Sequence, residues 1–356
     1  MKAVVYEKKG VVRIKDVPMP AILEPRDALV KVMRASICSS DLHIRNGGVP
    51  RAKEGVVLGH EFAGEIVKIG SGVKRFAVGD RVAVNVESFC GECFYCRRGF
   101  VNNCVEGGWE LGCRIDGGQA EYVRVPTADM SCTHIPESLS YEQALFVGDV
   151  LATGYWAAGI GEIQPADVVL VLGAGPTGLT TMMSARLFGP AVIVAADVSD
   201  ARLALAREKG LCDVAVNPLR EDVISVVKSL TEGRGADVVF EVAGAKNTFE
   251  TAWQAARPNA VVVVVALYEE AQSLPLHRMY GKNLTFKTGG VDASKCSEIM
   301  RLIEAGRLDT NLMITHRAPL NDVIRGYDVF SGQKEGCIKW VITPFEPDRP
   351  ILAEQF

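Results

Sequence analysis

The chain has 356 residues, and because about 150 residues per domain is usual, two domains are favoured over one or three. Hydrophobic residues make up 48% and charged residues 23%, which is typical of a globular protein and excludes disorder, collagen and coiled coil. Lysine and arginine number 39 against 43 aspartate and glutamate, a formal charge of −4, so no basic surplus exists for binding nucleic acid or an anionic membrane.

The first part of the chain, up to about residue 150, is rich in short strand-like segments punctuated by Gly, Pro and Asp. These segments span residues 1–6, 28–35, 65–69, 81–86 and 120–125. Turn residues at this density predict a small barrel-like β domain.

The middle part changes in pattern after Pro165. Short apolar runs, separated by stretches of helical periodicity, span residues 168–172, 191–196, 214–216, 237–241, 260–266 and 284–287. Continuous apolar runs are what a parallel sheet needs when helices cover both of its faces. We therefore predict a doubly wound α/β domain here. The tail, residues 291–356, has helical patterns at 295–304 and 320–330 and a strand-like run at 337–342, and these patterns fit either domain.

Segments that would direct the chain to a membrane are not predicted. Residues 1–6 are followed directly by Glu7, Lys8 and Lys9, which leaves no apolar stretch for a signal peptide. The longest apolar run, residues 260–267, is far shorter than the roughly 18–20 residues of a spanning helix. We expect a cytoplasmic protein whose ten cysteines are thiols and metal ligands rather than disulfides.

Gly173, Gly175 and Gly178 form a G-x-G-x-x-G between the strand 168–172 and a helical run at residues 177–188. Such glycines let the backbone turn tightly and approach a pyrophosphate at the N-terminus of a helix. Asp197, at the end of the second strand, is placed to accept hydrogen bonds from adenosine ribose hydroxyls. The alternative is a tight strand-to-helix turn with no ligand.

Cys90, Cys93, Cys96 and Cys104 are separated by two, two and seven residues. Two-residue spacing lets consecutive thiolates point at one ion, and four thiolates complete a closed tetrahedral zinc site. An iron–sulfur cluster is the less favoured alternative. Because a closed site has no open position for a substrate, we expect it to brace a surface lobe.

A second metal site needs ligands from distant parts of the chain, and Cys38 and His60 are the natural candidates. Individually, each also fits a structural role, because buried cysteine behaves as a small hydrophobe and a lone histidine is usually structural.

The residues around these two positions resemble a known family. Gly59-His60-Glu61, followed by Gly64, Gly70 and Val73, is similar to the zinc signature of the medium-chain, zinc-containing alcohol dehydrogenases. Further matching motifs occur in the family's order, namely Cys38 to His43, the four cysteines, Gly148-Asp149 before Thr153-Gly154-Tyr155, and the Gly173 loop with Asp197. The resemblance covers essentially the whole chain.

The resemblance implies an α/β protein with a GroES-like, β-rich catalytic domain and a Rossmann domain built on a doubly wound parallel sheet. The catalytic domain would comprise residues 1–152, with a structural zinc lobe at about residues 88–106, and the Rossmann domain residues 153–290. Residues 291–356 would largely return to the catalytic domain, and the active cleft would lie between the two domains.

The resemblance also implies a catalytic zinc held by Cys38, His60 and Asp149. Where many members carry a second cysteine, this chain has Asp149, as bacterial secondary-alcohol dehydrogenases do, so two anionic ligands and one neutral ligand are retained. Glu61 resembles the family's transient fourth ligand, and Asp41 resembles a residue that orients a liganding imidazole. Two zinc ions per chain are therefore expected.

By the same matching, Ser40 and His43 resemble the family's proton relay, and Val86, Trp109 and Leu267 occur where residues lining the substrate pocket lie. For Trp109, ordinary core packing is an equal alternative. Val86 is smaller than the aromatic residue often found in primary-alcohol enzymes, and Ser40 lacks the methyl group of threonine. Both favour a secondary alcohol.

The cofactor is expected to be NAD rather than NADP, because the Asp197 carboxylate would repel a 2′-phosphate. The residues matched to cofactor binding are Gly173, Gly175, Pro176, Thr177, Gly178, Asp197, Arg202, Ala243, Ala266, Leu267 and Lys339.

The expected activity is zinc-dependent, NAD-linked hydride transfer between a small to medium secondary alcohol and its ketone. One alternative is a polyol dehydrogenase of the same family, although sorbitol dehydrogenases usually show a glutamate zinc ligand where Asp149 stands. An alternative of another class is a nucleotide-binding protein that keeps the fold without the chemistry. Family habit implies a homotetramer or homodimer with a small-molecule substrate.

Overall fold

The structure is a computed structural model that describes residues 1–345. The chain forms two compact units. Unit 1 contains Met1–Ala152 and resumes at Asp292, and unit 2 contains Thr153–Val291. Residues 346–356 of the predicted C-terminal segment lie outside the described part of the chain. In that described part, every helix is too short or too polar to cross a membrane.

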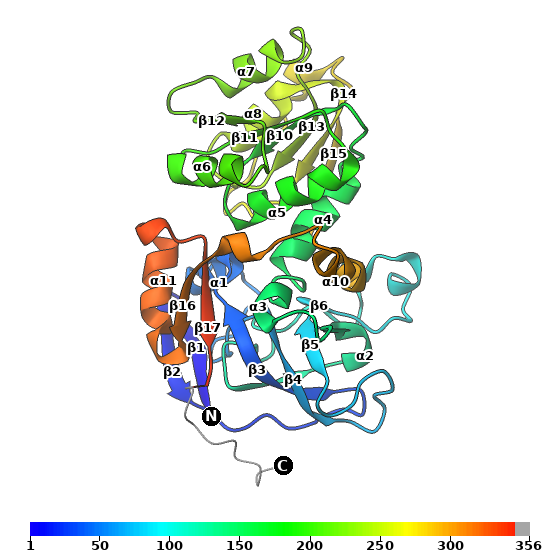
Figure 1. Ribbon diagram of the computed structural model, residues 1–356, viewed down its shortest axis with the longest axis vertical. Coiled ribbons are helices and arrows are strands. Elements are labelled where there is room, and N and C mark those ends of the chain that lie inside the picture. The colour runs from blue at the N-terminus through cyan, green and yellow to red at the C-terminus, as the bar shows by residue number, and fades with distance from the viewer. Residues whose placement is uncertain (346–356) are drawn as a thin grey trace. The chain divides into compact units, whose positions relative to one another are not determined.

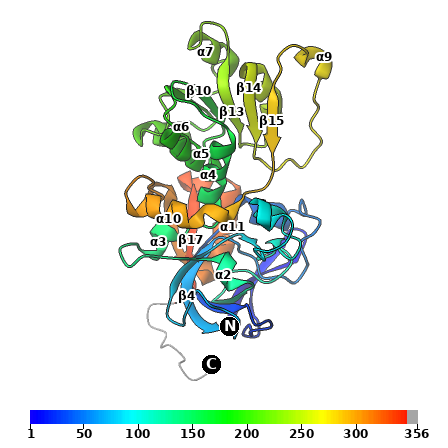
Figure 2. The ribbon, with the colours of Figure 1, turned by 90° about the vertical axis from the view of Figure 1, so that its right-hand side faces the viewer.

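Unit 2 is built on a six-stranded parallel sheet with the order β12-β11-β10-β13-β14-β15. Its strands are β10 (Val168–Leu172), β11 (Val192–Ala196), β12 (Val214–Val216), β13 (Ala236–Glu241), β14 (Ala256–Val264) and β15 (Thr285–Thr288). Figure 2 shows β10, β13, β14 and β15 side by side in this order. The chain therefore crosses over between β12 and β13, which is the doubly wound topology that binds dinucleotides between the first and fourth strands.

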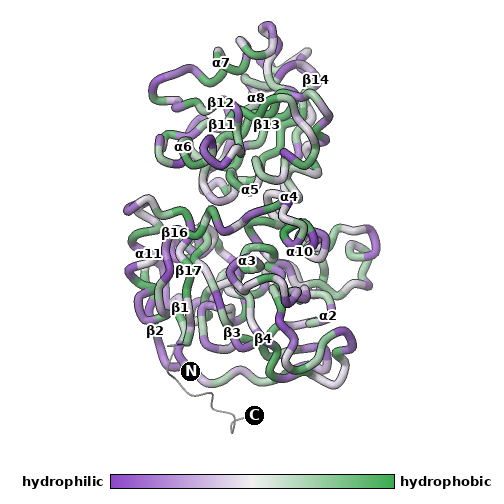
Figure 3. The backbone as a smooth tube through the Cα atoms, in the orientation of Figure 1, coloured by the Kyte–Doolittle hydropathy of each residue, from purple (hydrophilic) through white to green (hydrophobic). Residues whose placement is uncertain are grey.

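Helices cover both faces of this sheet. They are α5 (Pro176–Ala185), α6 (Asp200–Glu208), α7 (Val223–Ser229), α8 (Thr248–Ala255) and α9 (Leu276–Met279), with α4 (Val150–Ile160) crossing the unit boundary. Residues of α7 and α8 pack against Leu170, Val194 and Val239 on one face, and α5 and α6 lie on the other (Figure 1). All residues of β10 are buried, as its continuous apolar run requires, and the sheet is coloured as hydrophobic in Figure 3.

The main sheet of unit 1 has seven strands, in the order β16-β17-β3-β4-β5-β9 with β8 also paired to β3. Two small ribbons, β1 with β2 and β6 with β7, complete the strands of this unit. The bounds are β1 (Lys2–Lys8), β2 (Val11–Asp16), β3 (Ala28–Ser36), β4 (Phe62–Ile69), β5 (Arg81–Val84), β6 (Glu87–Ser88), β7 (Gly108–Trp109), β8 (Tyr122–Val125), β9 (Cys132–His134), β16 (Ile314–Pro319) and β17 (Lys339–Thr343). Because β17 pairs with β3, the C-terminal segment completes the sheet begun by the N-terminal one.

Short helices surround this sheet, namely α1 (Ser39–Arg45), α2 (Ala128–Ser131), α3 (Tyr141–Ala144), α10 (Cys296–Glu304) and α11 (Val323–Ser331). In α10 the buried residues are Cys296, Ile299, Met300 and Ile303, which share one face at helical spacing. A β-rich unit and a doubly wound unit confirm the predicted fold class.

The predicted strand at residues 81–86 is interrupted in the structure. It ends at Val84 and resumes as β6. The reason is that the backbone N–H of Asn85 donates to the carbonyl of Ser131, and that of Val86 donates to the carbonyl of Gly148. The chain thus leaves the main sheet at this point. It then forms β6, in which Glu87 pairs with Trp109 of β7.

Candidate metal centres and nucleotide loop

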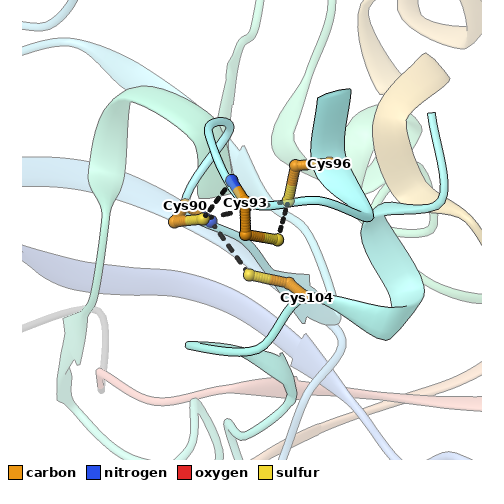
Figure 4. A group of neighbouring side chains, drawn as sticks. All are labelled: Cys90, Cys93, Cys96 and Cys104. Atoms are coloured by element: carbon orange, nitrogen blue, oxygen red, sulfur yellow. Dashed lines mark hydrogen bonds between the residues drawn. The ribbon is translucent and has the colours of Figure 1, made fainter. Parts of the chain in front are cut away.

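Four cysteine side chains converge in the segment between β6 and β7, and Figure 4 shows them pointing toward one another. The Sγ atoms of Cys93 and Cys96 are 3.5 Å apart, and those of Cys90 and Cys96 are 4.0 Å apart. With Cys104, all four lie within 4.8 Å of one another. Thiolates placed tetrahedrally at about 2.3 Å from zinc are about 3.8 Å apart, so the group fits a closed zinc site.

Backbone N–H groups support two of these sulfur atoms. The N–H of Cys90 donates to Sγ of Cys104 at 3.2 Å, and that of Cys93 donates to Sγ of Cys90 at 3.4 Å. Donors around a sulfur favour the thiolate, which is the form that binds metal. Phe94 and Phe100 of the same lobe are exposed. With few apolar side chains inside it, the lobe (residues 88–106) depends on the cysteine cluster for its internal contacts.

Cys38, His60 and Asp149 form a second group, although they are far apart in the sequence. Cys38 precedes α1, His60 precedes β4, and Asp149 precedes α4. One potential ligand atom of each lies within 4.8 Å of the others, and all three side chains are largely buried. Nε2 of His60 is 3.3 Å from Oδ2 of Asp149. The structure therefore brings together the three residues expected to hold the catalytic zinc.

The electrostatics of this group match a bound cation. Burial alone would lower the pKa of His60, but the negative charges of Asp41, Asp149 and Cys38 raise it well above its usual value. Burial also raises the pKa of the Cys38 thiol, with Asp149 adding to the shift. A positive charge placed among these atoms would relieve the repulsion. One sulfur, one imidazole and one carboxylate oxygen are donors that zinc accepts.

A chain of polar contacts extends from His60 to α11. Oδ1 of Asp41 lies 3.3 Å from Nδ1 of His60, and Oδ2 of Asp41 accepts from the backbone N–H of Cys38 and from Nε2 of Gln119, at 2.9 Å and 3.0 Å. The hydroxyl of Tyr327 on α11 donates to Oε1 of Gln119 at 2.8 Å. Asp41 therefore contacts two of the three candidate zinc ligands, Cys38 and His60. A carboxylate in this position can orient the imidazole ring.

Glu61 and Lys339 form a buried ion pair. Oε2 of Glu61, which contacts Nζ of Lys339, also accepts from the Ser36 hydroxyl. Oε1 of Glu61 accepts from the N–H of Val150 at 3.2 Å. Glu61, expected as a transient ligand, is therefore bonded elsewhere in this structure. Lys339, expected to contact a cofactor phosphate, is 1% exposed and also donates to the carbonyl of Ile37. The pair fixes the start of α4, directly after Asp149.

Ser40 and His43 lie on α1, three residues apart, and residues at this spacing share a helix face. Oγ of Ser40 is 4.0 Å from Sγ of Cys38. Both side chains are half-buried.

An aromatic ring and a cation lie beside His60. Trp109 packs edge-on against the imidazole, with ring centroids 5.3 Å apart, and Arg51 covers the indole at 5.1 Å. Val86, predicted to line the substrate pocket, is buried. Glu87, which the sequence reasoning missed, is also buried and pairs across the β6–β7 ribbon with Trp109. Its only sequence signal is a carboxylate directly after a strand-like run, which more often marks a solvated turn.

In unit 2, the glycine motif lies between β10 and α5. Gly173 has φ +111°, a conformation that disfavours other residues, and a Cβ at Gly178 would lie 1.9 Å from the carbonyl oxygen of Gly173. Gly175 precedes α5, and Pro176 and Thr177 occupy its first turn. The first N–H groups of α5 therefore stand open at the carboxyl edge of the sheet, where a pyrophosphate binds in folds of this topology.

Asp197 joins this loop to α6. Its Oδ2 accepts from the backbone N–H of Ala174 at 2.7 Å, and its Oδ1 accepts from that of Ser199 at 2.8 Å. Ser199 in turn caps α6 through the N–H of Arg202. Nη1 of Arg202 would lie 3.6 Å from a Cβ at Gly175, so the guanidinium lies beside the glycine loop.

The remaining predicted cofactor residues follow the neighbouring strands. Ala243 follows β13 and lies next to Gly173, at 3.2 Å from the position of a Cβ there. Ala266 and Leu267 follow β14 and lie against Gly244. Leu267 is 53% exposed within the described structure. The carboxyl ends of β10, β13 and β14 therefore bring together the glycine motif, Ala243, Ala266 and Leu267.

Comparison with known proteins agrees with both units. The family model for the alcohol dehydrogenase GroES-like domain matches residues 24–137, and the model for zinc-binding dehydrogenases matches residues 176–305. The chain is 34% identical to an alcohol dehydrogenase of Cupriavidus necator, over 97% of this chain and 99% of that protein.

Solved structures show the same likeness. Alcohol dehydrogenase TADH from Thermus sp. ATN1 has 36% identity and a TM-score of 0.89, covering 96% of this chain and 99% of its own. Zinc-dependent alcohol dehydrogenase 2 from Streptococcus pneumonia has 33% identity and a TM-score of 0.92, covering 98% and 100%.

Proposed function

Because the chain belongs to the zinc-containing medium-chain alcohol dehydrogenases, we propose that it interconverts small to medium secondary alcohols and their ketones, with NAD as the hydride carrier. As a member of this family it is an oxidoreductase that uses zinc and a nicotinamide cofactor. The observation that carries the proposal is the convergence of Cys38, His60 and Asp149, with Ser40 4.0 Å from Cys38.

We assign the catalytic zinc to Cys38, His60 and Asp149, and a structural zinc to the four cysteines. When bound, the catalytic zinc supplies a Lewis acid that lowers the pKa of an alcohol hydroxyl, while the nicotinamide ring carries the hydride. The Asp41 carboxylate keeps the His60 ring oriented for this task, because it lies 3.3 Å from Nδ1. Glu61 positions Asp149 through its bond to the N–H of Val150.

Ser40 and His43 form the proposed proton relay. Ser40 lies beside Cys38, so its Oγ can accept the proton of the alcohol while its own hydroxyl proton passes on toward His43. His43 then releases a proton to solvent. Reversal of the same transfers reduces a ketone.

NAD is the proposed cofactor, because the Asp197 carboxylate lies at the turn that would receive the adenosine ribose. A 2′-phosphate next to this carboxylate would be repelled, and each tenfold of preference corresponds to about 1.4 kcal/mol. Arg202 beside the loop offsets part of the repulsion. We expect kcat/KM with NAD to exceed that with NADP, and a higher value with NADP would show that the role of Asp197 is wrong.

Secondary alcohols are the proposed substrates because Val86 and Ser40 are small. We would compare kcat/KM for 2-butanol, ethanol and sorbitol, and repeat the series with Val86→Phe. The parent protein should prefer 2-butanol, and the phenylalanine should lower the ratio of 2-butanol to ethanol, because it fills the space of the second alkyl group. If ethanol or sorbitol is the best substrate, the proposed substrate class is wrong. No activity on any alcohol or ketone would favour a non-catalytic nucleotide-binding protein.

A cytoplasmic location and a homodimer or homotetramer complete the proposal. The ten cysteines are free thiols in the structure. Sedimentation of the purified protein would give its oligomeric state.

A further inference from the structure

Two buried polar atoms close to the metal-ligand group lack a partner. Glu87 is 7% exposed and Trp109 is 9% exposed. Within residues 1–345, neither Oε2 of Glu87 nor Nε1 of Trp109 makes a hydrogen bond. Leaving a buried polar group unsatisfied costs about 1–3 kcal/mol, and nearly all such groups in folded proteins are bonded. Two of them on neighbouring residues therefore indicate a ligand that is bound here during function.

The two side chains are placed to bind one group between them. Glu87 and Trp109 are directly paired in the antiparallel β6–β7 ribbon, and directly opposed residues project from the same face with Cβ atoms about 5 Å apart. The indole N–H only donates, whereas a carboxyl oxygen accepts. Nε1 of Trp109 and Oε2 of Glu87 do not bond to each other. A group that accepts from the indole N–H and donates to the carboxyl oxygen would therefore satisfy both atoms. A hydroxyl is the smallest organic group that does so.

Trp109 connects this pair to the residues that we assign to the catalytic zinc. Its ring stands edge-on to His60, at 5.3 Å and an interplanar angle of 70°. Arg51 covers the indole, with its guanidinium 5.1 Å from the ring centroid. Asp149 also lies close enough to Glu87 to act on its charge. A small substrate bound at the zinc site of Cys38, His60 and Asp149 would therefore have Glu87 and Trp109 as its neighbours.

We propose that Glu87 and Trp109 form a hydroxyl subsite that selects alcohols with a second hydroxyl beside the reacting carbon, that is, short vicinal diols and, in the reverse direction, α-hydroxyketones. The second hydroxyl accepts from Nε1 of Trp109 and donates to Oε2 of Glu87. An aliphatic alcohol of the same length leaves both atoms unsatisfied. This inference rests on the proposed function and narrows its substrate class.

The charge of Glu87 suits this role. Burial raises the pKa of the carboxyl to about 8, and the Arg51 guanidinium opposes the shift. A neutral carboxyl offers one O–H donor and one carbonyl acceptor, so it can bond to a hydroxyl in either direction. A carboxylate would serve as an acceptor only. In both states a hydroxyl satisfies it, whereas a methyl group does not.

The test compares 1,2-propanediol with 2-propanol, because both are oxidised at the second carbon of the same three-carbon chain. With zinc-loaded wild-type enzyme and NAD, we expect kcat/KM to be at least about tenfold higher for the diol, because a polar site discriminates strongly against an analogue that lacks the hydroxyl. Hydroxyacetone and acetone should show the same order in the reverse direction.

Substitutions assign the preference to the two side chains. Glu87→Leu and Trp109→Phe should each lower the diol-to-alcohol ratio about tenfold, mainly through KM, while the zinc content stays unchanged. Glu87→Gln keeps an acceptor and a donor and should retain most of the preference. Glu106→Gln, which removes a carboxylate from an exposed ion pair with Arg26, is the matched control and should leave the ratio unchanged.

The outcomes separate this inference from the proposed function. If 2-propanol is oxidised but wild type shows no preference for the diol, or Glu87→Leu and Trp109→Phe leave the ratio unchanged, a structural water satisfies the two atoms and the subsite is wrong. If neither alcohol nor either ketone reacts, the proposed function itself fails, and the subsite fails with it.

Discussion

The two candidate metal centres of unit 1 are built in opposite ways. The four cysteines lie within residues 90–104, in a lobe whose aromatic side chains Phe94 and Phe100 are exposed. Cys38, His60 and Asp149 come from three distant segments and lie in the buried part of the unit. In the lobe, short-range chain geometry places the ligands. At the second centre, strands, helix starts and buried hydrogen bonds place them.

This difference predicts that the two metal ions have different roles. In the lobe, the metal supports the structure, because little apolar surface is buried there and structural zinc contributes directly to folding free energy. At the second centre, the structure supports the metal, through Asp41 and through the Glu61–Lys339 pair. Loss of one ligand should therefore abolish chemistry at one centre and local stability at the other.

The largest expected effect is at Asp149. Asp149→Ala should remove one of two zinc ions and lower kcat/KM by at least about a thousandfold, equivalent to about 4 kcal/mol of transition-state stabilisation. Asp149→Cys is the matched control, because it restores an anionic ligand and should retain two zinc ions. Elemental analysis and steady-state kinetics measure both. A single zinc ion in the wild-type protein would contradict the two-centre interpretation.

The next effect is at the lobe. Cys93→Ser should also lower the zinc content from two to one, but it should mainly speed proteolysis within residues 88–106, since the lobe loses its internal support. Cys132→Ala, a buried cysteine outside both groups, should keep both zinc ions. Equal loss of zinc and of protease resistance in the two variants would contradict the comparison.

A smaller effect is expected along the polar contacts from Tyr327 to His60. Gln119→Leu removes the acceptor of the Tyr327 hydroxyl and one of the two hydrogen bonds to Oδ2 of Asp41, and should weaken zinc binding at the second centre about tenfold, the lower end for outer-shell partners. Tyr327→Phe should weaken it less, and Tyr141→Phe should have no effect. Competition with a chelator measures the affinities. Zinc affinity that does not change in Gln119→Leu would mean that Asp41 needs no support.

The smallest effect concerns an ion pair that ties unit 1 together without metal. Hydrogen bonds from Arg317, opposed by burial, hold the pKa of Glu142 below its usual value, and Arg34 adds to the shift. A lowered carboxyl pKa contributes stability above the unfolded value, about 4.3, and that contribution is lost as the pH falls through the folded value.

Because Arg317 is largely exposed, Glu142→Gln should cost at most about 1 kcal/mol near pH 7, and the difference from wild type should shrink below about pH 4. Urea unfolding at several pH values would show this. A difference that grows toward low pH would contradict the assignment.

Local patterns in the sequence predicted the parts of the fold that depend on near neighbours. The buried strand at residues 168–172 and the strand at 214–216 have the predicted bounds, because continuous apolar runs permit few other structures. The four cysteines likewise converge because their spacing restricts where their side chains can point.

Long-range pairing was not predictable in the same way. Strand β16 was missed because only its first residue, Ile314, is buried and because its parallel partner, β17, follows an intervening helix. Lys339 reads as an exposed cation in the sequence, yet β17 carries it into the interior beside Glu61. Glu87 was missed for the same reason, since only the pairing of β6 with β7 places it opposite Trp109.

Asp197 limits how the cofactor preference of this chain can evolve. Its two carboxylate oxygens already accept from the backbone N–H groups of Ala174 and Ser199, one in the glycine loop and one at the start of α6. A substitution that makes room for a 2′-phosphate therefore also releases the turn on which either nucleotide must bind. A single substitution at this position that removes the repulsion of a 2′-phosphate should therefore weaken the binding of both nucleotides, so a switch of coenzyme requires a second substitution that restores these two hydrogen bonds.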